Sequence, residues 1–389
     1  MHTTATHHES MRDSINDTLR NAGITRDHAH CSGCSLCVLV CPVWRATRDL
    51  RLSPEGRCKA LQHGADIDAI APALEACTLC SACEAVCPEN INLIDSVLAL
   101  RQILPAKSDR AAAQEHVAHR LRERTSGIPA VPLSAPHRLL AGGRSMPEER
   151  LLAGISKALA CEISSADAGD DIVAALEAGV PVPPERRARL LGSLAGAKQV
   201  TVADGLLARQ LRRWAPALKV ASLGEALSGV SAVRRALQPT DLYVIEPRAF
   251  HADYERLVTH YDTLRQERGC VMNLDLQRIA VPASMLGIDG QLGLEDPHAS
   301  SAQAAQIDWI LHGRDVQRIV VEDWADVAHF RAHTALPVLH LAELLPDAKS
   351  HEINARVAPQ LLTQLETMEP VTEAFPAIDD PAVTGKAVF

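Results

Sequence analysis

The chain has 389 residues, of which 47% are hydrophobic and only 3% aromatic, which is enough material for two or three domains with buried cores. Its formal net charge of -9 excludes the broad basic field that is typical of nucleic-acid-binding proteins. No apolar run reaches the ~18 residues of a membrane span, and the start, MHTTATHHES, lacks the features of a signal peptide. We therefore expect a cytoplasmic protein without a nucleic-acid partner, whose only membrane association would be through a complex.

Residues 1–24 are expected to form a tail and a helix, because Ser10 can cap a helix that Gly23 ends. Residues 25–107 contain nine of the eleven cysteines, and the apolar spacing in GADIDAIAPALEA and NLIDSVLALRQIL is helical. Pro72 should break or kink the first of these helices. Residues 108–148 are expected to form a further helix and then a linker rich in Pro, Gly and Ser.

Residues 149–368 alternate short β-branched runs with helical stretches, which predicts an α/β domain with a largely parallel sheet. The expected strands are QVTVA, LKVAS, DLYVIE, QRIAV, QRIVVE and LPVLHL. The last residues, 369–389, are weakly patterned and are expected to form a mobile acidic tail.

The cysteines form a repeat. CSGCSLCVLVCP at residues 31–42 and CTLCSACEAVCP at residues 77–88 share the spacing CxxCxxCxxxCP and together supply eight thiolates, as two 4Fe-4S clusters require. Three cysteines spaced by two residues can surround one cluster, whereas the fourth, on the departing chain, reaches the other cluster. We therefore predict one cluster on Cys31, Cys34, Cys37 and Cys87, and a second cluster on Cys77, Cys80, Cys83 and Cys41.

Other assignments of these residue types fit the sequence less well. Structural zinc usually takes separated pairs of ligands, so it fits this spacing poorly. The isolated Cys58, Cys161 and Cys270 are interpreted as buried free thiols. The remaining metal-ligating residues of interest are interpreted as solvated helix residues and not as ligands: Asp323, Asp326, His251 and His260.

The long helical gap between Cys41 and Cys77 resembles the α-helical ferredoxin domain of the iron-sulfur subunits of succinate dehydrogenase and heterodisulfide reductase. The segment CPVWRATRDLRLSPEGR is similar to the one that follows the first cluster motif in the iron-sulfur subunits of glycolate oxidase and anaerobic glycerol-3-phosphate dehydrogenase. The last two proteins carry electrons from a flavoprotein toward quinone.

In those relatives, two cysteine-rich modules with Cys-Cys-Gly elements follow the ferredoxin domain. Here TDLYVIEPRAFHADY and DVQRIVVEDWADVAHFRAHTALPVLHLAELL resemble the module framework, but the chain contains no Cys-Cys pair. The resemblance therefore implies a degenerate cysteine-rich-type α/β domain (degenerate CCG-type) that builds no cluster of its own.

The resemblance implies an iron-sulfur electron-transfer subunit that is not catalytic alone. It would relay electrons between a flavoprotein dehydrogenase and a downstream acceptor, either quinone or another redox subunit. Two alternatives stay open: a non-catalytic subunit of a heterodisulfide-reductase-like complex, and an iron-sulfur scaffold or sensor. Between Arg45 and Lys59, five basic residues against two acidic ones give a local charge of +3, which is a candidate docking surface for an acidic donor.

Overall fold

The structure is a computed structural model, and it describes residues 14–105, 107–127, 134–142, 148–294 and 299–346. The predicted N-terminal helix is helical over residues 14–21, whereas its expected cap, Ser10, and the predicted tail at 369–389 lie outside the described residues. None of the described helices is long and apolar enough to cross a membrane.

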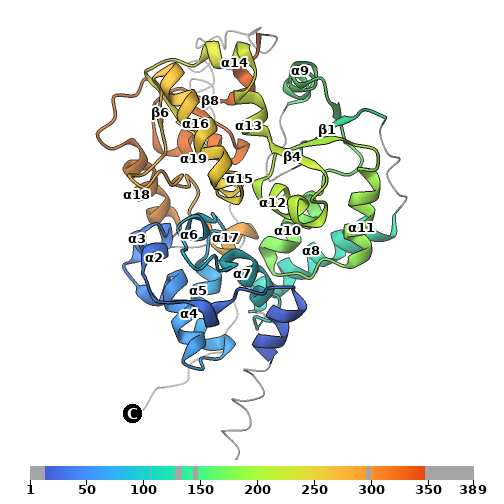
Figure 1. Cartoon of the computed structure of the whole chain (residues 1–389), viewed down its shortest axis with the longest axis vertical. Coiled ribbons are helices and arrows are strands. Elements are labelled where there is room, and N and C mark those ends of the chain that lie inside the picture. Colours follow the sequence, from blue (N-terminus) through green and yellow to red (C-terminus); the bar gives the residue numbers. More distant parts are fainter. Residues whose placement is uncertain (1–13, 106, 128–133, 143–147, 295–298, 347–389) are drawn as a thin grey trace, which may run out of the picture. The chain divides into compact units, whose positions relative to one another are not determined.

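The cysteine-rich part is helical, as its apolar spacing predicts (Figure 1). Side chains begin two of its longer helices, because Ser53 accepts the backbone N–H of Gly56 and Asp66 accepts that of Ala69. The elements are η1 (His28–His30), α2 (Leu36–Leu39), α3 (Pro42–Thr47), η2 (Leu50–Leu52), α4 (Pro54–Gln62), α5 (Ile67–Ala76), α6 (Ala82–Ala85) and α7 (Leu93–Arg101).

Helix α5 contains Pro72 in its interior, where the sequence predicts a break or a kink. The helix nevertheless continues to Ala76, so the break does not occur. A proline inside a helix removes one hydrogen bond and costs about 3 kcal/mol. Burial of the inner face offsets this cost, because Ile70 and Leu74 are only 2% and 0% exposed.

Strands and helices alternate through the rest of the chain (Figure 1). The strands are β1 (His137–Leu140), β2 (Glu162–Ile163), β3 (Gln199–Val202), β4 (Lys219–Ser222), β5 (Asp241–Val244), β6 (Val271–Met272), β7 (Arg318–Val321) and β8 (Val338–His340). The helices are α8 (Ser108–Ser126), α9 (Glu149–Leu159), α10 (Asp170–Ala178), α11 (Pro184–Ser193), α12 (Gly205–Trp214), α13 (Leu223–Ser228), α14 (Ser231–Ala236), α15 (Pro247–Ala252), α16 (Tyr254–Arg268), α17 (Ile288–Gln291), α18 (Ala299–Leu311), α19 (Trp324–His333) and η3 (Leu341–Leu344).

The strands form two parallel four-stranded sheets with the same internal order. The first sheet has the order β2-β1-β3-β4, and the second has the order β6-β5-β7-β8. In the first sheet, Val200 of β3 lies opposite Arg138 of β1 and Val220 of β4. The predicted fold class, a helical ferredoxin-type region followed by an α/β part with parallel strands, is confirmed, and the α/β part contains two sheets where one was expected.

Two short segments differ from the sequence pattern. The run QRIAV at 277–281 is not a strand: Ala280 makes only an isolated bridge with Leu274, and the strand of this region is the shorter β6. Strand β1, in turn, lies inside the segment expected to be a helix and a linker. Short apolar runs of this kind cannot be assigned by periodicity alone, because strand and loop give the same local pattern.

The cysteine-rich part and the first sheet share one hydrophobic core. Leu74 and Val97 belong to the same cluster of buried side chains as Val200 of β3. The second sheet packs around separate clusters, but its helix α15 contacts both α12 and α6. At the first of these contacts a Cβ on Gly205 would lie 2.1 Å from Glu246 Oε2, so only glycine allows the two helix starts to touch.

Arg186 provides a test of the buried polar contacts in the first sheet's layer. Its guanidinium donates to Asp171 and Asp167 over distances of 2.7–2.9 Å, and its side chain is 0% exposed. Arg186→Met leaves two buried carboxylates without their cation, so the free energy of unfolding should fall by about 3–5 kcal/mol. Urea unfolding followed by circular dichroism measures this loss. Arg235→Met, at an exposed arginine, should change it by less than about 0.5 kcal/mol, and equal effects of the two substitutions would contradict this account.

Candidate metal centre

The two cysteine motifs fold into loops with the same backbone conformation. The residue before the second cysteine is left-handed in both loops, with φ of 79° at Gly33 and 58° at Leu79. The residue after it is also left-handed, with φ of 62° at Ser35 and 63° at Ser81. Such conformations cost about 1–3 kcal/mol for a residue other than glycine, so their repetition indicates a shared functional constraint. Successive backbone N–H groups in turns of this kind form concavities that hold anions, including iron-sulfur groups.

The first cavity is lined by Cys31, Cys34 and Cys37 of the first motif and by Cys87 of the second motif. It measures about 340 Å³ with its opening included. Cys34 is exposed, whereas the other three cysteines are half-buried. Cys58 of α4 also lines this cavity. The structure therefore brings the first predicted set of four cysteines together and adds a fifth.

The second cavity is lined by Cys77, Cys80 and Cys83 of the second motif and by Cys41 of the first motif, and it measures about 360 Å³. Three of these cysteines are buried. Each cavity therefore takes its fourth cysteine from the other motif, and Pro54 at the start of α4 lines both cavities. The geometry is the one expected for crossed ligation, and iron binding by these eight cysteines stays a prediction.

In the described ranges, no group of three or more His, Cys, Asp or Glu side chains is spaced to hold a single metal ion. Of the four other residues of metal-ligating type that the sequence singles out, His260 has its Nε2 2.8 Å from Ser228 Oγ. His251 and Asp326 are 5% and 4% exposed, so their interpretation as solvated helix residues is wrong. Their helices pack these faces inward, which a single helix pattern does not reveal.

Side chains outside the motifs hold the carbonyl group of each first cysteine. Lys59 Nζ and Gln62 Nε2, both on α4, each donate to Cys31 O at 2.9 Å. At the equivalent position of the second motif, Arg101 Nη2 donates to Cys77 O at 2.6 Å. Hydrogen bonds from charged donors are the stronger ones, so Lys59 and Arg101 fix the entry of each loop.

His251 on α15 ties the second loop to the second sheet. Its Nε2 accepts the backbone N–H of Ala280 at 3.1 Å, so its Nδ1 carries the proton and donates to Cys80 O at 2.7 Å. Burial lowers the pKa of His251 to about 4. The ring therefore stays neutral at physiological pH and keeps both contacts.

Hydrogen bonding and burial shift the thiol pKa values in opposite directions. A hydrogen bond from Cys58 lowers the pKa of Cys31 to about 6, although burial opposes this shift. Burial raises the pKa of Cys41 to about 12, against the backbone N–H groups of Trp44 and Val43. Iron binds thiolates, so the buried second set loses its protons only where a positive partner compensates them.

Two buried arginines beside the second cavity have no anionic partner within hydrogen-bonding distance among the described residues. Arg57 lines the cavity, is 4% exposed, and leaves Nη2 without a hydrogen-bond partner. Arg101 is 1% exposed and donates only to oxygens of neutral groups. A cluster held by four thiolates is an anion that accepts hydrogen bonds at sulfur. The donor set and the orphaned cations therefore fit a 4Fe-4S group.

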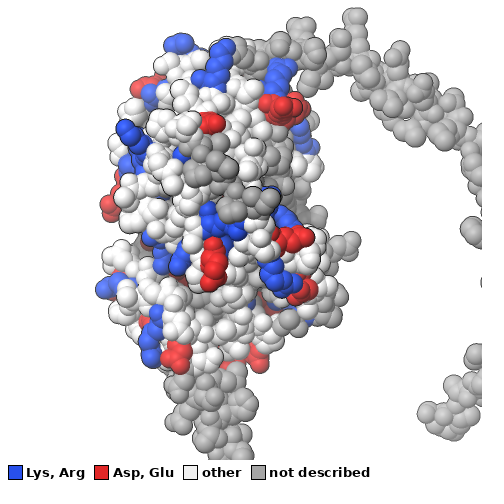
Figure 2. Space-filling view, turned by 90° about the vertical axis from the view of Figure 1, so that its right-hand side faces the viewer, with Lys and Arg blue, Asp and Glu red and all other residues white. Residues whose placement is uncertain are grey.

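Sequence reasoning placed the basic stretch on the surface and missed these roles. Arg57 is buried, while the exposed arginines of the stretch are partly neutralised, with Arg45 bound to Asp275 at 2.7 Å and Arg51 to Asp49 at 2.6 Å. Figure 2 shows positive and negative side chains interspersed over the displayed face, without a broad basic area.

One sequence signal does point at the first cavity. A helix that begins at Pro54 places Glu55, Cys58 and Gln62 on one face, at i, i+3 and i+7. Glu55 and Cys58 line the cavity, and Gln62 holds the Cys31 carbonyl.

Residues 27–91 match the family model of a 4Fe-4S dicluster domain. The matched range contains both cysteine motifs and the helices between them. A search of curated proteins and a search of solved structures each returned no match to the chain. The family match indicates an iron-sulfur protein and supports an electron-transfer role.

The two cysteines of the α/β part lie apart from both cavities. Cys161 directly precedes β2 and Cys270 directly precedes β6, and they are 7% and 1% exposed. Both belong to one hydrophobic cluster around the second sheet. They pack as small apolar side chains, in agreement with their interpretation as buried thiols.

The contacts of His251 can be tested by His251→Phe, which keeps a ring but removes both polar atoms. The Cys80 carbonyl and the Ala280 N–H would then be buried without partners, each at a cost of about 1–3 kcal/mol. We expect the midpoint of thermal unfolding to fall and iron to be lost faster to a chelator. His312→Phe, at an exposed histidine, is the control, and an unchanged midpoint and chelation rate in His251→Phe would contradict the role.

Proposed function

We propose that this chain is an iron-sulfur electron-transfer subunit that holds two 4Fe-4S clusters and relays electrons between a flavoprotein dehydrogenase and a downstream acceptor. The downstream acceptor is quinone or another redox subunit. The observation that carries the proposal is the pair of adjacent cavities, each lined by four cysteines with the fourth from the other motif. When bound, clusters of this kind accept and donate single electrons.

The chain's own residues give the two cavities different exposures and charges. The first cavity reaches solvent at Cys34 and is lined by Glu55, whose Oε2 has no hydrogen-bond partner. The second cavity is enclosed by buried cysteines and is lined by the cation Arg57. An electron held near Arg57 is stabilised by the guanidinium, so the buried end of the relay should be the easier one to reduce.

The proposed donor would dock near the exposed first cavity. Large exposed apolar side chains of the described residues gather around this end, and they are Leu36, Leu39, Leu50, Leu276 and Trp309. Arg45 connects several of them, since its Nε donates to Leu39 O at 3.0 Å and its guanidinium lies 5.2 Å from the Trp309 ring. Arg48 is exposed beside them. An apolar patch with a basic rim favours a partner with an apolar face and acidic edges.

Two clusters require about eight iron and eight sulfide per chain, measured on protein prepared without oxygen. Cys41→Ala should damage mainly the cluster held by Cys77, Cys80 and Cys83, as followed by electron paramagnetic resonance of the reduced protein. A content that stays near four iron after reconstitution, or zinc in place of iron, would sink the proposal. Loss of the Cys31 cluster alone would reverse the pairing of the motifs.

The role of Arg57 can be tested by Arg57→Leu, which removes the charge and the orphaned donor. The reduction potential of the cluster in the second cavity should fall by about 60 mV, a tenfold change in a one-electron equilibrium. Redox titration followed by electron paramagnetic resonance measures both clusters. Arg57→Lys should recover part of the shift, and Arg51→Leu, at an exposed arginine, is the control. Equal shifts of both clusters in Arg57→Leu would contradict a local effect.

Docking can be tested on the complex isolated without oxygen, once its flavoprotein chain is identified. Arg48→Glu should slow electron delivery from that chain and flatten the dependence of the rate on salt, because a rim charge acts mainly on encounter. Iron content should not change. Arg235→Glu, at an exposed arginine of α14, is the matched control. An unaltered rate for Arg48→Glu at low salt would discard this docking surface.

A further inference from the structure

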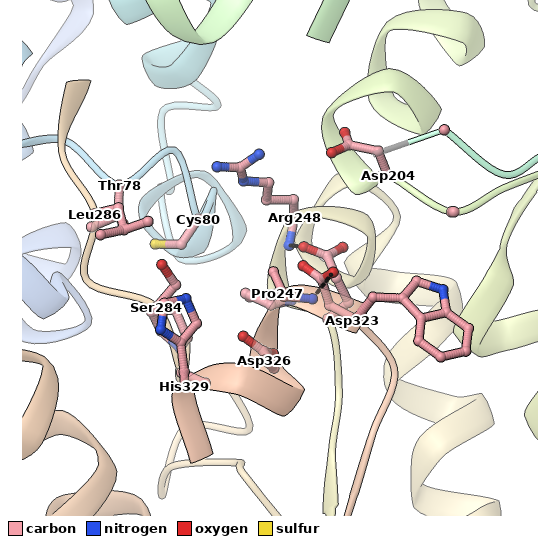
Figure 3. A pocket seen from close by; sticks show the side chains of 17 residues that line it. Thr78, Cys80, Asp204, Pro247, Arg248, Ser284, Leu286, Asp323, Asp326 and His329 are labelled. Carbon is pink, nitrogen blue, oxygen red and sulfur yellow. Dashed lines mark hydrogen bonds between the residues drawn. The ribbon is translucent and has the colours of Figure 1, made fainter. Parts of the chain in front are cut away.

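A third cavity, of about 740 Å³ with its opening included, lies at the carboxyl ends of strands from both sheets. We call it the central cavity. Its wall contains Asp204 after β3, Glu246 after β5 and Asp323 after β7, and the second cysteine loop contributes Cys80 (Figure 3). In open parallel sheets, ligands bind outside the carboxyl ends of the strands, and this volume is typical of small-molecule sites.

Three carboxylates of the central cavity are explained by the fold, because each begins a helix. Asp204 accepts the N–H groups of Leu206 and Leu207 at the start of α12. Glu246 accepts two N–H groups at the start of α15, and Asp323 accepts one at the start of α19. These three residues therefore stabilise helix ends whether or not the cavity binds anything.

Asp326 has no such role. It lies in the first turn of α19, is 4% exposed and lines the central cavity (Figure 3). Within the part of the chain that the structure describes, its carboxylate takes part in no hydrogen bond or ion pair. Burying a carboxylate in this way is costly, and burial raises the pKa of Asp326 well above its usual value, followed by repulsion from Asp323. The fold gains nothing from this charge, so a ligand is its natural partner.

The charges around the cavity select the sign of that ligand. Among the lining residues, four carboxyl groups stand against one cation, Arg248. Arg248 is itself bound by Glu177, with 2.7 Å between Nη1 and Oε1. Burial and the neighbouring Asp323 raise the pKa of Glu246 to about 8, which again reports uncompensated negative charge. A further anion would be repelled, whereas a cation would be held.

We propose that the central cavity is a binding site for a small organic cation, with its protonated amine at Asp326. Apolar side chains of the same wall can cover the carbon part of such a ligand, and they are Pro247, Pro282 and Leu286. This assignment uses none of the cysteines as ligands, so it stands or falls independently of the proposed electron-transfer function.

The test uses the full-length protein, prepared without oxygen, and isothermal titration calorimetry at pH 7.5. The probe is butylammonium, with butyrate and 1-butanol as matched compounds of the same length. We expect saturable binding of butylammonium at one site per chain and no binding of the other two. Absence of saturable amine binding, binding of butyrate, or binding of Mg²⁺ in place of the amine would each overturn the proposal.

Asp326→Asn separates a ligand site from a structural contact. It should weaken butylammonium binding at least tenfold, and it should raise the midpoint of thermal unfolding, because a neutral group of the same shape replaces a buried unpaired charge. Asp308→Asn, at an exposed aspartate of α18, should change neither quantity. A lower midpoint with intact amine binding in Asp326→Asn would show that the carboxylate serves the fold and would refute the site.

Discussion

A buried guanidinium without a carboxylate partner lies where three parts of the molecule meet. Arg101, at the end of α7, donates to the carbonyl groups of Leu74, Cys77 and Glu177 and to the side chain of Gln291. Burial lowers its pKa to about 10, which shows how poorly this site compensates a cation. The end of α5, the second cysteine loop and α10 are all positioned by this one charge. An anionic group among the cysteines would complete its environment, so the loop geometry and the proposed cofactor depend on the same residue.

The two cysteine cavities differ because they face different surroundings. The first opens to solvent beside exposed apolar side chains, while the second is covered by α15 and held by His251. Cys80 lines both the second cysteine cavity and the central cavity. A ligand bound near Asp326 would therefore share a wall with the buried end of the proposed relay. Small-molecule binding and the properties of that cluster can be coupled through one cysteine.

Much of the site was accessible from the sequence because ligand spacing is a local property. The repeat CxxCxxCxxxCP predicts which four cysteines meet, and the structure places them so. The supporting residues could not be predicted, since Arg101 and His251 reach the loops from elements far along the chain. The fold class also followed from alternating patterns, but the division into two sheets did not. Its one faint trace is the likeness of VTVADGLLA to IVVEDWADV, whose aspartates are Asp204 and Asp323.

The identical strand order of the two sheets makes the α/β part an internal duplication, and the two copies can be compared position by position. Asp204 and Asp323 both stand two residues after the third strand of their copy and begin ten-residue helices. At the position of Glu246 the first copy has Gly142, and at that of Asp326 it has the fully buried Leu207. The first copy forms the same sheet without these two acids. Where one copy manages without a charged group that the other buries at a cost, the group belongs to what the second copy acquired after the two diverged.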